Sequence, residues 1–583
     1  MSGHRILPFL TAIAAALLLA GASRSSAQTT AMEAYEHAQN LRHQEAAPLI
    51  QGSDANPDSI RKGIEILEGA LDYLDEPAIR DLSYGNVYLR FRRFDVHRDL
   101  ALAHAKLGEN DRAIEHIRGV LEVGTGESVL KWLDREPGLA DLRETEAFLS
   151  LRAGVAAETR IATGSSLRTR YKKNLSDAEK IAGLSTFWSR ARADFVYFDQ
   201  VPDLDWDRAY MDAIPRVLAT KSTMDYYLEL MRFAALLGDG HTNAYPPPEL
   251  RSKMYSRPPM RTRLIEDKVL VTEVYSEALR KQGLEVGTEI VSVDGLSPSD
   301  YVAKNVNPYV SSSTSQDREK RCYSYHFLAG PEDASVALEL VSASGESFAR
   351  DIARGGYTDE SRPARNAFRE LDGGFTYLAL DHFESDEPVK AFLAAFDTIR
   401  ASKGLVLDLR RNGGGNTEYG YEILSRIVDR PFYGERTRHR VRDSLYSARA
   451  RGSIEWQVNQ PRPRPPKEGA FLGPVAVPIG PDTFSAAEDF VVAFDDADRG
   501  PLVGRATGGS TGQPLMFSLP GGGSARICVK RDTYADGREF VGYGIAPDIE
   551  VAPTVESVRA GRDLELEAAV AALRKAAGSG ARD

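Results

Sequence analysis

"KGLVLDLRRNGGGN", residues 403–416, has the pattern of a strand buried on both faces that opens into a glycine-rich turn. Its apolar positions are Leu405, Val406, Leu407 and Leu409. Such a continuous run is typical of a parallel strand covered by helices on both sides. Apolar strands alternate with helical segments from 365 to 555, which predicts an α/β core with a largely parallel sheet. The Arg- and Pro-rich interruption at 431–468 is expected to be an exposed loop.

The whole chain is too long for one hydrophobic core, because it has 583 residues. Hydrophobic residues make up 42% and charged residues 27%, which is ordinary for globular proteins and excludes a disordered or polytopic membrane protein. The formal net charge of -11 disfavours broad nucleic-acid binding, which needs a basic face. We therefore expect several globular domains and no nucleic-acid partner.

The first 27 residues have the form of a secretory signal peptide. His4 and Arg5 precede an apolar run of about 15 residues, and Ser25 to Ala27 forms a small-x-small cleavage site. No cysteine follows the apolar run, so a lipid-anchored cleavage site is missing. The mature protein is expected to be periplasmic or secreted, without an integral membrane span. Cys322 and Cys528 allow at most one disulfide there, and the sequence leaves their pairing open.

Residues 31–155 are expected to be helical. In "LALAHAKLGENDRAIEHIRGVLE", two apolar stripes are interrupted at Gly108 to Asp111, which predicts two packed helices. This stretch resembles a tetratricopeptide repeat, although only one good copy is present. Both a helical cap and a module that binds a protein partner remain open. The polar stretch 156–177 is expected to be a linker.

Two further domains are expected before the α/β core. Residues 178–250 are helical at first, and Ser222 with Asp225 forms an N-terminal capping signal before the last helix. Residues 258–355 turn to strands, including 269–274 and 289–293, and resemble a PDZ domain without an obvious glycine-rich carboxylate loop. An unrelated small β domain is the alternative. The core is assigned to 365–558 and a C-terminal helix to 559–583.

The stretch "VAVPIGPDTFSAAEDFVVAF" places Ser485 between a strand and an amphipathic helix. This geometry exposes a nucleophile and directs the first N–H groups of the helix at a developing oxyanion, although a serine there is often only an N-cap. The glycines of 413–415 follow another strand and could direct further N–H groups at an anion. Asn416 and Thr417 follow them, whereas a phosphate loop requires lysine.

The stretch "LLGDGHTNAYPP" ends an apolar helix at Gly238 and Gly240 and then presents His241. A histidine that follows a helix breaker is free to face a cleft. A serine nucleophile needs such a base.

The ordered set "GDGHT", "LDLRRNGGG", "TFSAAEDF", "VGRATGGSTG" and "GYGIAPDIEVAPT" resembles the carboxyl-terminal processing and tricorn-core serine peptidases over about residues 178–575. The resemblance implies that Ser485 is the nucleophile. It also implies that N–H groups of Ala486 and of Gly413 or Gly414 form the oxyanion hole.

The chain departs from the processing-peptidase branch at the general base. That branch carries a lysine where this chain has Ser510, whereas the tricorn-like branch uses a histidine, which implies His241. The resemblance also implies an acidic third member. Strict spacing from Gly544 points to Val541, but Glu539 lies two residues earlier on the same face of an expected strand and is the candidate. Its competitors are Asp239, Glu488 and Asp489.

The resulting expectation is a multidomain α+β protein: an N-terminal TPR-like helical region, a helical subdomain, a PDZ-like β domain and an α/β peptidase core. We expect it to be an exported serine endopeptidase that acts on peptides or unfolded proteins and recognises their C-terminal tails. The expected reaction needs no metal and no cofactor. Two alternatives remain, a peptide- or protein-binding scaffold with an impaired site and a carrier of hydrophobic ligands. Fluorophosphonate labelling and bound lipid, respectively, would distinguish them from the enzyme.

Overall fold

The computed structural model describes residues 31–84, 87–163, 167–355, 366–441, 448 and 454–579, so the expected signal peptide lies outside it. The chain divides into two compact units, Met1–Ser165 and Ser166–Asp583. Among the described residues, no helix combines the length and the apolar character that a membrane crossing needs.

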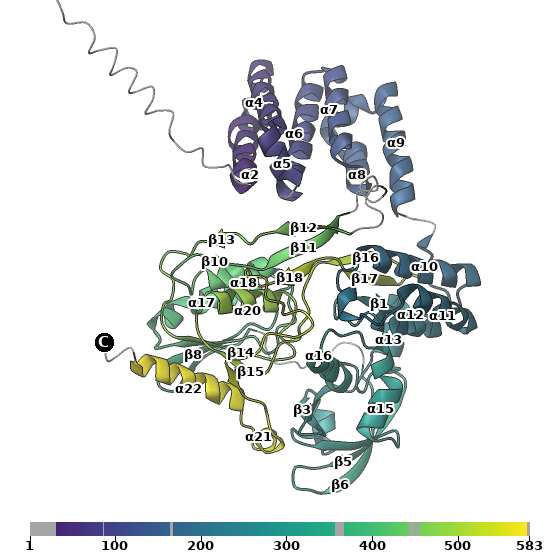
Figure 1. The fold of residues 1–583 in the computed structure, drawn as a ribbon, viewed down its shortest axis with the longest axis vertical. Helices are drawn as coiled ribbons and strands as arrows, with labels where there is room; N and C mark the ends of the chain where they lie inside the picture. The colour runs from purple at the N-terminus through teal and green to yellow at the C-terminus, as the bar shows by residue number, and fades with distance from the viewer. Residues whose placement is uncertain are drawn as a thin grey trace, which may run out of the picture. The chain divides into compact units, whose positions relative to one another are not determined.

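The first unit is helical, as the sequence predicts (Figure 1). Its α-helices are α2 (Ala31–Asn40), α3 (Ala47–Gln51), α4 (Pro57–Asp75), α5 (Pro77–Tyr84), α6 (Val87–Lys106), α7 (Asn110–Val123), α8 (Glu127–Arg135) and α9 (Glu146–Thr163). The predicted break between two packed helices separates α6 from α7, and α6 also packs against α4. The prediction of a linker from residue 156 is wrong in its first part, because α9 continues to Thr163. The repeat resemblance stays a prediction.

The second unit begins with three helices, α10 (Asp177–Asp194), α11 (Trp206–Ala219) and α12 (Thr223–Ala235). The Ser222 hydroxyl accepts the N–H of Asp225 at 3.1 Å and caps α12. Gly238 then takes a φ of +57°, which ends the helical path. The following strand β1 (Asn243–Tyr245) pairs antiparallel with β17 (Ser524–Cys528), which joins the helical segment to the core.

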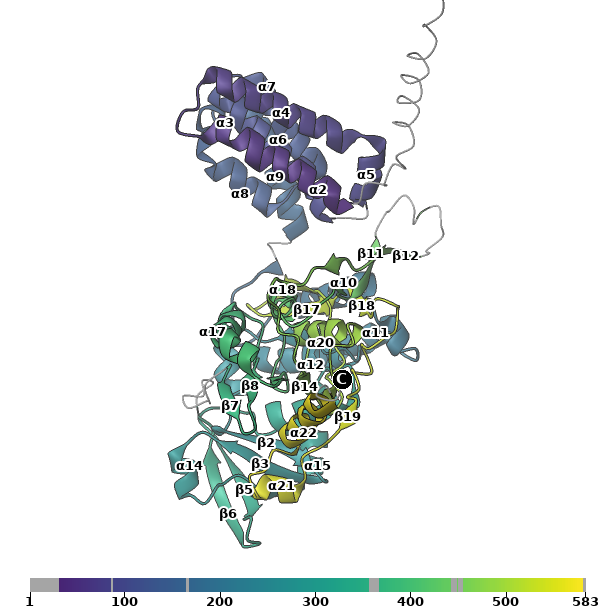
Figure 2. The same cartoon turned by 90° about the vertical axis from the view of Figure 1, so that its left-hand side faces the viewer.

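The β domain forms one antiparallel sheet with the strand order β2-β3-β4-β5-β6 (Figure 2). The strands are β2 (Met260–Ile265), β3 (Lys268–Val274), β4 (Glu289–Val293), β5 (Ser335–Val341) and β6 (Ser347–Ala353). Three α-helices lie within the domain, α14 (Glu277–Lys281), α15 (Pro298–Asn305) and α16 (Ser315–Lys320). The domain has a hydrophobic core of its own, which contains Cys322. Its relation to PDZ domains stays a prediction.

The α/β core contains a six-stranded sheet with the order β19-β15-β14-β9-β8-β7. Its strands are β7 (Phe368–Leu371), β8 (Phe375–Ala379), β9 (Leu405–Asp408), β14 (Val475–Ile479), β15 (Leu502–Gly504) and β19 (Ile549–Glu550). All neighbours pair parallel except β7 with β8. The prediction of a largely parallel sheet is confirmed.

Both faces of this sheet are buried. Leu405 and Leu407 face the large core cluster that includes Phe490 of α20, whereas Val406 joins a second cluster with Leu573 of α22. Figures 1 and 2 show α22 beside the strands. The helices of the core are α17 (Glu387–Ala401), α18 (Thr417–Leu424), α20 (Ala486–Asp496), α21 (Val555–Arg559) and α22 (Leu564–Ser579). The continuous apolar run at β9 therefore reflects burial on both sides.

The expectation that 431–468 is a loop is wrong for its described part. This stretch contains β10 (Phe432–Tyr433), β11 (Arg436–Val441), β12 (Glu455–Asn459) and β13 (Pro463–Arg464). β11 pairs with β12 and with β18 (Arg531–Thr533) of the core, so long-range pairing overrides a polar composition. β16 (Pro514–Ser518) completes the sheet of β1 and β17. Cys322 and Cys528 are both free and buried.

Candidate active site

The turn between β14 and α20 presents Ser485. Its φ is +59° and its ψ is −129°, a region that strains a residue with a side chain. A strained turn between a strand and a helix makes a serine hydroxyl project away from the backbone, as in the nucleophile elbow of serine hydrolases. The residue is only half-buried, so the turn that carries the hydroxyl is partly open to solvent.

His241 lies beside this hydroxyl. Its Nε2 is 3.0 Å from Oγ of Ser485, although the two residues are 244 positions apart in the sequence. The imidazole is only 3% exposed and stacks on the ring of Phe484, with the ring centres 4.8 Å apart and the planes at 10°. The β1–β17 pairing holds the segment that follows the histidine. The fold thus fixes both the position and the plane of the imidazole.

Burial lowers the pKa of His241 well below its usual value, and the positive charges of Arg526, Arg321 and Lys530 lower it further. The imidazole is therefore neutral at pH 7. When the Ser485 hydroxyl donates to Nε2, the ring proton sits on Nδ1. The ring is then in the form that can accept the serine proton.

Ser510 and Asp239 continue the hydrogen-bond chain on the far side of the ring. Nδ1 of His241 lies 2.9 Å from Oγ of Ser510, and that hydroxyl donates to Oδ1 of Asp239 at 3.4 Å. Both residues are buried, and burial raises the pKa of Asp239. Ser510 was singled out in the sequence only as the place of a missing lysine. Because Ser510 takes the position of the lysine base in the processing-peptidase branch, the same match could have identified it as a residue near the His241 base.

The structure does not bring Glu539 to this group. Its carboxylate pairs instead with Arg531 at 3.1 Å and with Arg438 at 4.0 Å. The expected strand reverses direction at Tyr534 to Gly537, where the N–H of Gly537 donates to the carbonyl of Tyr534. Glu539 therefore folds back against Arg531, which spacing along a presumed continuous strand could not reveal.

Glu488 and Asp489 lie on the first turn of α20 but do not hydrogen-bond to the imidazole. Glu488 accepts the N–H groups of Ser485, Gly509 and Ser510 at 3.2, 2.7 and 2.9 Å. Burial raises its pKa to about 7. Asp489 accepts hydroxyl protons from two threonines. Glu488 thus ties the segment that carries Ser510 to the nucleophile turn.

The glycine-rich loop lies against the nucleophile. A Cβ on Gly414 would be 2.6 Å from Cβ of Ser485, and the φ of this glycine is +92°, so no side chain fits there. The N–H of Gly414 donates to Oδ1 of Asn412 at 2.9 Å. The N–H groups of Gly413 and Ala486 have no acceptor among the described residues. These two groups are the available donors for an oxyanion.

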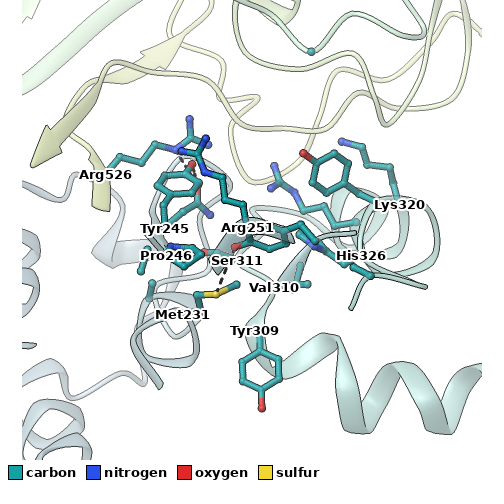
Figure 3. Close-up of a pocket in the computed structure, with 18 of the residues that line it drawn as sticks. Met231, Tyr245, Pro246, Arg251, Tyr309, Val310, Ser311, Lys320, His326 and Arg526 are labelled. Atoms are coloured by element: carbon teal, nitrogen blue, oxygen red, sulfur yellow. Dashed lines mark hydrogen bonds between the residues drawn. The ribbon is translucent and has the colours of Figure 1, made fainter. Parts of the chain in front are cut away.

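A cavity of about 470 Å³ opens beside this group, with Gly413 and Phe484 in its wall. Figure 3 shows Arg526 and Tyr245 on one side of it and Lys320 on the other. The cationic residues of its lining are Arg251, Arg257, Lys320, Arg321 and Arg526. No Asp or Glu lies among its lining residues, so the cavity is positively charged.

The cations of the cavity wall differ in whether a carboxylate of the described residues pairs with them: Arg321 and Lys320 have such a partner, whereas Arg526 does not. Arg321 pairs with Asp317 at 2.8 Å, and Lys320 lies 3.6 Å from the same carboxylate. Arg526 donates instead to Oδ1 of Asn243 and to the carbonyl of Gly240, and has no carboxylate within ion-pair distance among the described residues. Its charge is therefore available to a ligand in the cavity.

Residues 374–551 match the family described as Peptidase family S41. The carboxy-terminal processing protease CtpA of Bacillus subtilis (strain 168) is 22% identical over 285 residues, which cover 48% of this chain and 53% of the relative. The chloroplastic C-terminal processing peptidase of Tetradesmus obliquus is 23% identical over 295 residues, which cover 50% of this chain and 58% of the relative. The chain thus spans little more than half the length of these curated relatives.

Two solved structures share the fold. Mature CPAF complexed with lactacystin has a TM-score of 0.52 and 14% identity, over 69% of this chain and 98% of that one. A second structure, the crystal structure of mature CPAF, has a TM-score of 0.51 and 14% identity, over 66% of this chain and 94% of that one.

Proposed function

We propose, since residues 374–551 belong to peptidase family S41, that this chain is a serine endopeptidase that hydrolyses peptide bonds of proteins or peptides. The observation that carries the proposal is the 3.0 Å contact between Nε2 of His241 and Oγ of Ser485. It joins a strained, half-buried serine to a neutral imidazole.

In the first half of the reaction, Oγ of Ser485 attacks the substrate carbonyl carbon and its proton passes to Nε2 of His241. The carbonyl oxygen becomes an oxyanion and accepts the N–H groups of Gly413 and Ala486. Loss of one such donor costs about 2.7–4 kcal/mol of barrier. The imidazolium then gives its proton to the leaving amine as the C–N bond breaks, which leaves an acyl-enzyme.

In the second half, a water molecule replaces the amine. His241 takes a proton from the water, the resulting hydroxide attacks the acyl carbon, and the same proton returns to Oγ of Ser485 as the ester breaks. The side chains of Ser510 and Asp239 contact the imidazole side of this group, and the carbonyl of Ser510 also accepts the N–H of Ser485 at 3.1 Å. They act as positioning residues that hold Nδ1 protonated and stabilise the imidazolium.

A fluorophosphonate probe and a peptide-cleavage assay test the proposal together. We expect labelling and cleavage by the wild type and neither by Ser485→Ala. His241→Ala should lose both, because the hydroxyl loses its base. A wild-type protein that folds but is neither labelled nor active would support the rival function, a peptide-binding scaffold on the same fold.

The charge of the cavity suggests the substrate class. Arg526 offers a cation without a carboxylate partner close to the nucleophile turn, so a substrate with a carboxylate near the scissile bond is favoured. That carboxylate is either the free C-terminus of a tail or an Asp or Glu side chain. Peptides with free and amidated C-termini, and with Glu replaced by Gln, separate the two sources. Equal kcat/KM for all of them would refute a carboxylate preference.

Export and a protein partner are further parts of the proposal. The signal-like segment 1–27 supports export to the periplasm or beyond, and N-terminal sequencing of the mature protein would show cleavage after Ala27.

The helical unit supports a protein partner through its repeat-like helices. Pull-down with residues 31–163 deleted, compared with the full chain, tests that role.

A further inference from the structure

A cluster of histidines lies in the N-terminal helical unit and plays no part in the proposed reaction. Glu68 comes from α4, His104 from α6 and His116 from α7. One potential ligand atom from each of the three lies within 4.8 Å of the other two. This is the only such group found among the described residues. Imidazole and carboxylate are the donors that zinc and its neighbours in the first transition row bind.

The spacing of the rings suits one shared ion. The ring centres of His104 and His116 are 5.3 Å apart with their planes at 11°, so a rotation of one ring brings both nitrogens to the same ion. Two imidazoles on one tetrahedral zinc have ring centres roughly 5 Å apart, because each Zn–N bond is about 2 Å long. Glu68 is exposed and can close the remaining distance by side-chain rotation.

The histidines also have the outer hydrogen-bond partners that metal ligands usually have. Nδ1 of His104 lies 2.8 Å from Oε2 of Glu109, and Nδ1 of His116 lies 3.2 Å from Nδ1 of His97. Such contacts orient a ring so that its other nitrogen faces the metal. Arg61 in turn holds Glu109, with Nη1 2.7 Å from the carboxylate.

A buried polar atom in the cluster lacks a partner. His104 is only 5% exposed, and its Nε2 has no hydrogen-bond partner among the described residues. The same holds for Nε2 of His97, which is 8% exposed. A buried nitrogen without a partner is costly, and a bound cation would satisfy it. Gly119 makes room for the cluster, because a Cβ there would lie 2.4 Å from the His97 ring.

We propose that Glu68, His104 and His116 bind one transition-metal dication of the zinc type. His97 and Glu109 hold the two ligating rings in place, and water completes the coordination shell. The ion joins α4, α6 and α7 and so stabilises the helical unit, independently of the peptidase site. Because a site of this kind forms only in the folded unit, metal binding adds to its stability.

Zinc titration of the full chain tests the site. We use chelator-treated protein with Ser485→Ala as background, so that self-cleavage does not interfere, and follow Zn²⁺ binding by calorimetry. One saturable site and a rise in the melting temperature with Zn²⁺, but not with Mg²⁺, are expected. Glu68→Gln should weaken binding at least tenfold, and so should His116→Gln. Glu65→Gln, on an exposed position of the same helix, is the matched control and should bind as before.

The outer partners give a second readout. Glu109→Gln should weaken Zn²⁺ binding by roughly 10- to 100-fold, as is usual for a residue that orients a metal ligand. Absence of a saturable Zn²⁺ site in the parent protein would overturn the proposal. So would equal affinity in the parent, Glu68→Gln and His116→Gln. Because Glu68 is exposed, its variant keeps the fold, and circular dichroism checks this.

Discussion

The hydrogen bond between His241 and Ser510 offers the sharpest test of the active-site geometry. Ser510→Ala removes the hydroxyl that lies 2.9 Å from Nδ1 of the imidazole and leaves the 3.0 Å contact with Ser485 in place. The bond matters most when the ring is positively charged, which is the case in the transition state. Ser510 itself is fully buried.

The size of the effect follows from the charge on the ring. A hydrogen bond to a charged group contributes about 1.5–3 kcal/mol. Each 1.36 kcal/mol of barrier corresponds to a tenfold change in rate. We therefore expect kcat of Ser510→Ala to fall by roughly 10- to 150-fold, with little change in KM.

The assay is steady-state cleavage of a fluorogenic peptide over a range of pH. Loss of the acceptor destabilises the imidazolium, so the pKa of His241 falls further and the acid limb of kcat/KM moves to lower pH. Thr511→Ala is the matched control, because its hydroxyl donates to Asp489 and not to the imidazole. A kcat of Ser510→Ala equal to that of the wild type would refute the positioning role. A loss of activity without any movement of the acid limb would show a merely structural effect.

Further predictions concern the glycine-rich loop, the cation Arg526 in the cavity wall and the Glu539 carboxylate, which does not reach the imidazole. Gly414→Ala should abolish fluorophosphonate labelling and lower the free energy of unfolding by about 1–3 kcal/mol or more, because its Cβ has no room at a φ of +92°. Gly413→Ala, with no heavy atom within 4 Å of its Cβ, should unfold at the wild-type temperature. Arg526→Gln removes a positive charge that lowers the pKa of His241, so the pKa of His241 should rise. As the pH is lowered, the variant should therefore lose activity at a higher pH than the wild type does. Arg526→Lys keeps the charge and should keep the wild-type pH profile. Glu539→Gln should keep kcat within about threefold of the wild type; a 100-fold loss would restore Glu539 as a candidate for the third member.

Local patterns predicted much of the fold. The apolar run at Leu405 to Leu409 indicated a strand buried on both faces, and β9 has that environment. The strand predicted at 289–293 coincides with β4, and Ser222 caps α12 as the capping signal indicated. Such features depend on residues close in sequence, so periodicity and turn chemistry suffice to find them.

Features that depend on distant pairing were missed. β11 forms in an Arg-rich stretch because β12 and β18 provide its hydrogen-bond partners. The reversal after β18 sends Glu539 to Arg531, although a continuous strand had been expected to carry it toward the imidazole. The histidines of α6 and α7 have no recognisable ligand spacing, since they converge only when the helices pack.

The sequence by itself determined which chemical groups this protein has and which local turn presents each of them: a serine before a helix, a histidine after a breaker and glycines after a strand. Only the tertiary structure decided which groups meet. It placed Ser510 and Asp239 behind His241, and it left the N–H of Gly413 available while Asn412 engaged that of Gly414. The physical reason is that local conformation follows from neighbouring residues, whereas contacts across hundreds of positions follow from sheet register and helix packing.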